Sequence, residues 1–558
     1  MGKIKMKLAG VNPLLKGILY FIGGLVLILL ILQLAIFIWG NNYVESQLRA
    51  QLRQSNTQGY SIDFEDLDLR VFSGSATIRN IRVDTDTSLF SSTDDTSSAP
   101  RFLFTGSLGQ LSLSGVNVFS SLMGEELHIG TLTLDSPDIS ALKNPNEVSR
   151  DDGSFSSVDS TILAGIPDRY TALEIGEIII KNGHGKLTQT DDTLSSLQQL
   201  NLSLREIRVD SASAQSGRLF ITDNISLDAR DFTMHLSDSL NTIAFNHLSI
   251  YSDDQTVALD SLQLNPRYGK LEFARRHGTT IDRIDLAIPN IRFESVDFPQ
   301  LVESGRIYAG YGHISDLRLE DYLNRGIPPG PPVAKPLPFV AFRDLNIPVK
   351  MDSLHIENAY ISYSEYVGDT PRAGTITFEQ TDAIFRNISN YPEDVEKGIT
   401  TTLDAESQVM GTGLLDVHFE FPMDTQNGFH KIEGKLSEMS MPHFNQMVEH
   451  VAFIRIDNGQ LDSLTFEMTL DQEQSSGTLV MNYENFSISV LNKQSIKQHG
   501  LLENFKTFLA NNFIVRKKNI PGNDMQAGRI DFERDESKSI FNYWWKSLLS
   551  GIKDSIRK

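Results

Sequence analysis

The sequence contains no cysteine and has far fewer basic than acidic residues. The absence of cysteine from 558 residues excludes disulfides, thiolate metal ligands and cysteine nucleophiles. The 50 Lys and Arg are outnumbered by 71 Asp and Glu, which gives a formal net charge of −21. Proteins that bind nucleic-acid phosphates normally carry the opposite balance, so we exclude nucleic acid as a partner.

The common catalytic and phosphate-binding motifs are also missing. No HExxH, GxSxG or GxxxxGK[ST] pattern occurs, and the 12 His are dispersed along the chain. Gly310–Gly312 and Gly411–Gly413 are isolated GxG triplets, which are more typical of turns than of phosphate-binding loops. We therefore predict that the protein is not an enzyme, and we expect no catalytic residues, no metal site and no cofactor.

One long uncharged stretch lies near the N-terminus. Residues 18–39 form a 22-residue apolar run, and about 20 residues suffice to span a bilayer as a helix. Four lysines precede it, and no small-x-small cleavage site follows. We predict a cytoplasmic tail at 1–16 and a transmembrane signal anchor at 17–40, with the rest of the chain across the membrane. The alternative is a long signal peptide that is removed.

The rest of the chain changes from helical to strand periodicity. Val44, Leu48 and Leu52 are four residues apart, which predicts a stem helix over 41–58. From 59 to 498, apolar residues alternate in short bursts separated by polar or Gly-containing turns, and few stretches could hold a helix of ten residues. The pattern predicts a mainly β fold with a long antiparallel sheet.

Composition suggests where the β region divides. Residues 326–338 hold six of the 20 prolines, and we predict a stiff linker there between β segments at 59–325 and 339–498. The Ser/Asp-rich stretches 85–100 and 143–161 are expected to be loops. A loose repeat, seen in GTLTLDSPDI (130–139) and DSLHIENAYI (352–361), is interpreted as a strand, a tight break and the next strand, although any β-rich chain can produce such matches by chance.

The C-terminal segment 499–558 is expected to be helical and amphipathic. Short helices are predicted at 442–453 and 501–513, and the last 18 residues put their apolar side chains on one arc of a helix beside basic residues. Two of the three Trp lie in this arc, and Trp favours membrane interfaces. We predict a membrane contact, or alternatively a helix docked on the protein's own core. The predicted membrane-contact residues are Trp39, Phe541, Trp544, Trp545, Leu548, Ile552, Lys546, Lys553 and Arg557.

Two stretches carry a family resemblance. GYSIDFEDLDLRVFSG (59–74) is followed by ATIRNIRV (76–83), and GQLDSLTF (459–466) is followed by GTLVMNYENFSISVL (477–491). Together with the anchor and stem, they resemble the AsmA-like proteins of the bacterial envelope, which are likened to bridge-like lipid transfer proteins. The resemblance implies an inner-membrane anchor, a periplasmic body, a β-sheet curled into an open groove, and phospholipid as cargo.

The residues support a groove independently of this resemblance. Strands that are apolar on one face need a place for that face, and curling it inward creates a groove suited to acyl chains. Strand parity assigns these residues to the groove: Ile284, Leu286, Ile291, Phe293, Leu354, Ile356, Ile361, Leu464, Phe466 and Met468.

We expect a membrane-anchored periplasmic protein that holds or conducts phospholipid between envelope membranes. Its expected partners are membrane phospholipids, the inner membrane at 17–40, and a second membrane or an envelope partner at the C-terminal end. One alternative is a structural or chaperone-like envelope protein that assists outer-membrane protein assembly without carrying lipid. Another is a binding module built of β-sandwiches.

Overall fold

A computed structural model describes most of the chain after residue 44. The described residues are 45–46, 48–50, 60–70, 73–90, 102–116, 126–144, 172–189, 192–210, 224–236, 239–368, 372–491, 515–522 and 525–557. The predicted tail, anchor and 501–513 helix lie outside these residues, as does Trp39. No helix within the described residues is long and apolar enough to cross a membrane.

The fold is mainly β, as predicted, and divides into two compact units. Unit 1 comprises Met1–Leu236, Ala244–Leu259 and Val302–Ser304, and unit 2 comprises Ser237–Ile243, Asp260–Leu301 and Gly305–Lys558. The Pro-rich segment 326–338 therefore lies inside unit 2 and does not separate the units. Strands β9 (Asn241–Tyr251) and β10 (Thr256–Pro266) each contain residues of both units.

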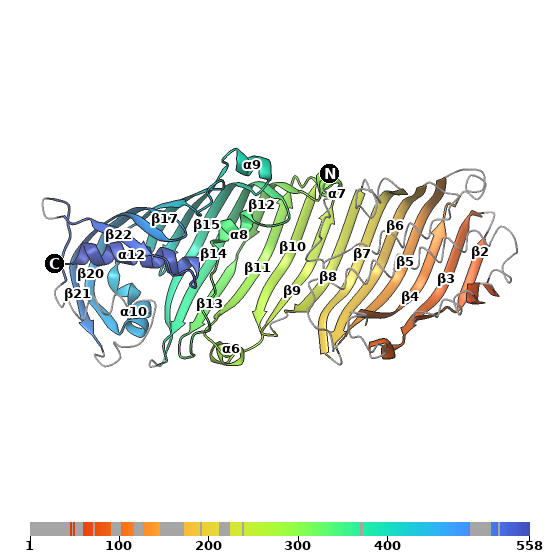
Figure 1. Cartoon of the computed structure of the whole chain (residues 1–558), viewed down its shortest axis with the longest axis horizontal. Helices are drawn as coiled ribbons and strands as arrows, with labels where there is room; N and C mark the ends of the chain where they lie inside the picture. Colours follow the sequence, from red (N-terminus) through yellow and green to blue (C-terminus); the bar gives the residue numbers. More distant parts are fainter. Residues whose placement is uncertain are drawn as a thin grey trace. The chain divides into compact units, whose positions relative to one another are not determined.

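Unit 1 is a mixed sheet of long strands (Figure 1). Strands β1 and β2 both pair with β3, and β3 to β8 then pair in chain order. Only the β5–β6 pair among these is parallel. The strands are β1 (Tyr60–Asp63), β2 (Asp66–Arg70), β3 (Ser75–Thr85), β4 (Phe102–Ser114), β5 (Glu126–Lys143), β6 (Ala172–Gln189), β7 (Asp192–Asp210) and β8 (Asn224–His235).

Unit 2 also has a mixed sheet, so the prediction of a purely antiparallel fold was wrong. Strand β11 pairs antiparallel with β12 and β13, which lie end to end as two halves of one strand, and both halves then pair in parallel with β14. From β14 the order continues antiparallel through β15, β16, β17, β18, β20, β21 and β22, with β19 beside β20. Parallel neighbours need a long connection. Residues 144–171 separate β5 from β6 in the chain, and residues 325–348, which include the predicted Pro-rich linker, separate β13 from β14.

The strands of unit 2 have the following bounds. They are β11 (Asp282–Glu294), β12 (Ile307–Ser315), β13 (Arg318–Asn324), β14 (Val349–Tyr366), β15 (Gly374–Ser389), β16 (Thr400–Val409), β17 (Gly413–Pro422), β18 (His430–Leu436), β19 (Met439–Ser440), β20 (Ile454–Leu470), β21 (Gln474–Val490) and β22 (Gly528–Glu533). Their apolar side chains form a core cluster that includes residues of β16 to β22 and of the C-terminal helix.

Most helices are short, and the predicted ones within the described residues are present. The helix expected at 442–453 is η4 (Met441–Phe444) followed by α10 (Asn445–Val451), and the C-terminal helix is α12 (Ile540–Ile556). Described residues 45–46 and 48–50 of the stem are helical, with Leu48 buried. The others are η3 (Thr87–Phe90), α6 (Lys270–His277), α7 (Phe298–Ser304), α8 (Pro338–Arg343) and α9 (Pro392–Glu396).

The loose sequence repeat is a long strand with a bulge, not a strand, a break and a second strand. Ser136 in β5, Asn182 in β6 and Asn358 in β14 have φ angles of 54°, 51° and 52° within otherwise continuous strands. Asn tolerates this left-handed conformation better than most residues, because its short polar side chain can hydrogen-bond locally. The β14–β15 register shifts at this position, next to Ile356 and Ala359.

Each bulge moves the apolar pattern by one residue and keeps it on the same face. In β15, Ile376 and Phe378 face the interior of unit 2 before Gln380, whose φ is 49°. After Gln380 the interior residues are Ala383 and Phe385, which have the opposite parity. A bulge adds one residue to one strand and so reverses which side chains face inward. Long bent strands can therefore present a continuous apolar wall.

Candidate functional site

Unit 2 contains a large cavity with mostly apolar walls. Its volume is about 1960 Å³, above the roughly 300–1,000 Å³ of typical small-molecule sites. The walls are one face of β13 to β18, β20 and β21, together with the Pro-rich segment and α12. Segments far apart in the sequence thus enclose one space.

Unbroken strands contribute every second side chain to the wall. Leu403 and Ala405 of β16 and Val417 and Phe419 of β17 line the cavity, as the period of a strand requires. Gly434 on β18 has no side chain, and the side chains of Phe466 and Val417 occupy the space beside it. A Cβ atom there would lie 2.6 Å from the Phe466 ring and 2.8 Å from the Val417 side chain.

The structure places most of the predicted groove residues at the cavity. Ile361 lies on β14 after the bulge and still faces the same space as the residues before it. The predicted residues that line the cavity are Ile284, Leu354, Ile356, Ile361, Leu464, Phe466 and Met468.

Three predicted groove residues of β11 do not line the cavity. Phe293 nevertheless lies on the same face as Leu354, because a Cβ on the intervening Gly312 would come within 3.2 Å of Phe293 and 2.8 Å of Leu354. Leu286 pairs with Leu319 of β13, whose side chain does line the cavity. Ile291 is buried.

Helix α12 rests on the sheet through its small and polar side. Ser547 hydrogen-bonds Ser475 of β21 over 2.7 Å, with both residues buried. Gly551 lies so close to β22 that a Cβ on Gly528 would be 1.9 Å from the Gly551 carbonyl oxygen. The Trp544 ring packs on Phe419 of β17, with centroids 5.0 Å apart, so the sheet curls around the helix.

The apolar arc of α12 faces the cavity. Its cavity-lining residues are Phe541, Trp544, Trp545, Leu548, Leu549, Ile552 and Ile556, and Lys546 joins them, whereas Lys553 and Arg557 do not line the cavity. This is the arrangement that the docked alternative describes, in which the arc contacts the protein's own sheet and cavity. Phe541 is the exception, being 58 % exposed.

A buried histidine fixes Trp544 in place. Trp544 Nε1 donates a hydrogen bond to His430 Nε2 over 3.1 Å, and His430 Nδ1 donates to the Gly428 carbonyl over 3.0 Å. Both bonds require a neutral imidazole, because protonated Nε2 could not accept. Burial lowers the pKa of His430 to about 4. Nothing in the sequence around His430 indicates this contact, since its partner lies on α12.

Charged side chains occupy only part of the cavity wall. The Asp, Lys and Arg residues that line it come from three segments, 277–282, 321–335 and 535–546, and none of the lining residues from Leu354 to Phe486 is charged. Two pairs are present: Lys335 Nζ lies 3.6 Å from Asp282, and Arg325 Nε lies 2.7 Å from the fully buried Glu365. The cavity is therefore amphipathic.

The carboxyl group of Asp321, in this charged region, is buried away from water. Burial, with a smaller contribution from neighbouring Asp282, raises the pKa of Asp321 to about 7. The Asp321 Oδ1 atom is buried and has no hydrogen-bond partner among the described residues. A carboxyl group in this state is partly protonated near neutral pH.

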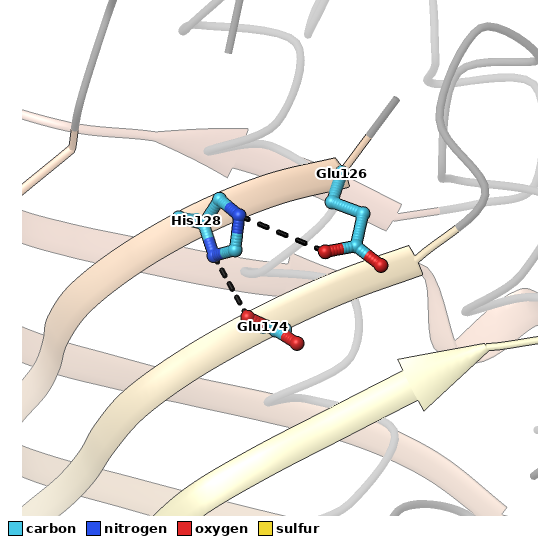
Figure 2. A group of neighbouring side chains, drawn as sticks. All are labelled: Glu126, His128 and Glu174. Carbon is cyan, nitrogen blue, oxygen red and sulfur yellow. Dashed lines mark ion pairs between the residues drawn. The ribbon is translucent and has the colours of Figure 1, made fainter. Parts of the chain in front are cut away.

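A separate ionic cluster lies in unit 1, formed by Glu126, His128 and Glu174 (Figure 2). His128 Nδ1 lies 2.8 Å from Glu174, and Nε2 lies 3.8 Å from Glu126. Their spacing would suit a metal ion, but Arg208 already pairs with both carboxylates. All four side chains are about one-third to one-half exposed. The cluster is best described as an ion-pair network between β5, β6 and β7.

Comparison with known proteins identifies no family for this chain. No protein-family model matches the sequence, and no curated protein matches it significantly.

Proposed function

We propose that the cavity of unit 2 binds the acyl chains of a membrane lipid. The observation that carries this proposal is the division of the cavity wall into a long uncharged part and a charged part. A lipid has the same division between its chains and its head. Burying its chains against the uncharged wall would contribute roughly 0.8 kcal/mol per methylene.

Helix α12 supports the same conclusion. It presents Trp544, Leu548 and Ile552 to the cavity, while small or polar residues such as Ser547 and Gly551 face the sheet. Water would be poorly stabilised in the cavity, because apolar walls offer it few hydrogen-bond partners. An apolar ligand is the occupant that this arrangement favours.

The wider role that we propose is to hold or conduct phospholipid between envelope membranes. The predicted anchor at 17–40 would tie the protein to the inner membrane, with the body in the periplasm. This proposal agrees with what the AsmA-like resemblance implies.

Photo-crosslinking tests the lipid proposal directly. Phe385 lines the cavity, and its neighbour Ile384 on β15 does not. We expect p-benzoylphenylalanine at Phe385 to form lipid adducts in cells and the same group at Ile384 to form few. Equal lipid labelling at both positions, or protein adducts alone at Phe385, would contradict the proposal, and protein adducts would favour the chaperone-like alternative.

A further inference from the structure

Three cations lie together in the charged part of the cavity wall. Arg325 follows β13, Lys538 precedes α12, and Lys546 lies in its second turn, and all three side chains line the cavity. Lys546 is half-buried, and burial lowers its pKa, with nearby Arg325 and Lys538 acting in the same direction. Three positively charged side chains thus share a region from which the solvent is partly excluded, while Asp535 and Glu365 act on the pKa of Lys546 in the opposite direction.

Two of these cations have no carboxylate partner. Arg325 is paired with buried Glu365. Neither Lys538 nor Lys546 forms an ion pair with a described residue. Lys546 Nζ lies 5.8 Å from the centre of the Phe532 ring. Asp535 acts on Lys546 electrostatically but makes no ion pair with it.

Asp535 is engaged elsewhere. Its Oδ1 atom accepts hydrogen bonds from the Ser537 amide over 3.0 Å and from the Ser537 hydroxyl over 2.6 Å. These bonds hold its carboxylate in the turn before α12. The desolvation cost of Lys546 is therefore not offset by an ion pair within the described residues.

We propose that Lys538 and Lys546, beside Arg325, form a site for the anionic head of the lipid whose chains fill the cavity. This inference rests on the proposed function and adds the charge and position of the head. A phosphate or carboxylate oxygen can accept charge-assisted hydrogen bonds from both ammonium groups. The head then lies near the start of α12, and the chains run along Leu548 and Ile552 toward the uncharged wall.

The test uses the full chain and three probes with the same acyl chain. They are lysophosphatidylglycerol with an anionic phosphate, palmitate with a carboxylate, and uncharged monopalmitoylglycerol. Each probe is added as a competitor while p-benzoylphenylalanine at Phe385 forms its lipid adduct. The measured quantity is the probe concentration that halves the adduct yield, called the half-displacement concentration. The variants are the double change Lys538→Gln and Lys546→Gln, and the control Lys553→Gln, which removes another half-buried lysine of α12 that does not line the cavity.

We expect the double change to raise the half-displacement concentration of lysophosphatidylglycerol about tenfold and to leave that of monopalmitoylglycerol unchanged. The Lys553→Gln variant should resemble the unaltered chain with every probe. A parallel loss for palmitate would assign the site to anionic heads in general, and a loss for the phospholipid alone would assign it to phosphate. Lys546→Arg keeps the charge and should keep the affinity.

The opposite outcomes are distinct. Unchanged displacement by both anionic probes, or an equal loss in Lys553→Gln, overturns the head site while the lipid proposal stands. Failure of every probe, monopalmitoylglycerol included, to displace the adduct from the unaltered chain overturns the proposed function itself. If the double variant does not fold, the two single changes should each give a smaller shift in the same direction, and no shift in either overturns the head site.

Discussion

The two units are built from the same kind of strand but use their apolar faces differently. In unit 1, Leu108 and Leu111 of β4 are fully buried and pack in one cluster with Leu132 and Leu134 of β5. In unit 2, Ile356 of β14, like Leu403 of β16, is only half-buried, because it borders a cavity. Alternation of apolar residues therefore does not by itself distinguish a filled core from an open cavity.

What distinguishes the cavity is the arrangement around it. Gly434 leaves space for the large side chains of neighbouring strands on the cavity face, and α12 contacts the sheet through its small residues while its apolar arc faces the cavity. The difference between the packed cluster of β4 and β5 and the open cavity of unit 2 leads to four predictions, ordered from the largest expected effect to the smallest.

Truncation should cost more in unit 1 than at the cavity. Leu132 is 1 % exposed, so Leu132→Ala should lower the free energy of unfolding by about 2–5 kcal/mol. Leu403→Ala should cost only about 1 kcal/mol, because the side chain already borders open space. Urea unfolding followed by circular dichroism, with hydrogen exchange to locate the change, measures both. Equal losses would show that the cavity wall is packed like a core.

The histidine beneath Trp544 should make unit 2 sensitive to acid. The folded pKa of His430 is about 4, below the unfolded value of about 6.5, so the unfolded state binds more protons between these values. The contribution of His430 to the free energy of unfolding should be level above pH 6.5 and fall by about 3 kcal/mol as the pH drops to about 4. Buried Asp321, whose folded pKa is about 7, acts in the opposite direction over the same range, so the contribution is the difference between the unaltered chain and His430→Gln. That difference should shrink as the pH falls, whereas His128→Gln in unit 1 should follow the pH dependence of the unaltered chain. A difference that stays constant with pH would contradict this role of His430.

The packing of α12 on the sheet depends on a close approach between its backbone at Gly551 and the backbone of β22 at Gly528. A Cβ on Gly528 would lie 1.9 Å from the Gly551 carbonyl oxygen, so Gly528→Ala should displace the helix and cost about 1–3 kcal/mol. A Cβ on Gly269 would meet nothing within 4 Å, so Gly269→Ala is the matched control and should change stability by less than about 0.5 kcal/mol. Tryptophan fluorescence and thermal unfolding follow the helix. Two similar variants would mean that α12 is not held by this contact.

Added volume should be tolerated only at the cavity. Ala405 lines open space, so Ala405→Leu should change stability by less than about 1 kcal/mol while reducing lipid adducts at Phe385. Ala141 in unit 1 is fully buried, and Ala141→Leu should cost about 1–3 kcal/mol. A comparable loss in both variants, measured by thermal unfolding, would contradict the open cavity.

The sequence predicts what depends on neighbouring residues and misses what depends on distant ones. Alternation predicts the mainly β fold, and the 3.6-residue period predicts α12, because both patterns are local. Strands β5 and β6 pair in parallel, and no local sequence pattern predicts the direction of that pairing. Asn358 within the repeat is compatible with a left-handed bulge as well as with a turn, and only the pairing with β15 decides between them.

The residues of the candidate site also fall into those that a local pattern predicts and those that only the fold brings together. Parity predicts Leu354 and Ile356 at the apolar wall, because the two residues share a strand. The charged region joins Arg325 to Lys538 and Lys546 across more than 200 positions of the chain, and Trp544 meets His430 across 114. Such contacts are set by topology, which the sequence pattern did not supply.

Native mass spectrometry of the full chain, released from mild detergent, tests the central claim most directly. The account predicts a bound amphiphile on the unaltered protein and a lower bound fraction on the double variant Ala383→Phe and Ala405→Phe, which narrows the cavity from two neighbouring strands. The matched change Gly269→Ala should keep the ligand, since a methyl group there meets nothing. An unaltered protein without a bound amphiphile, or an equal bound fraction on the narrowed variant, would contradict the claim that this cavity is a lipid site.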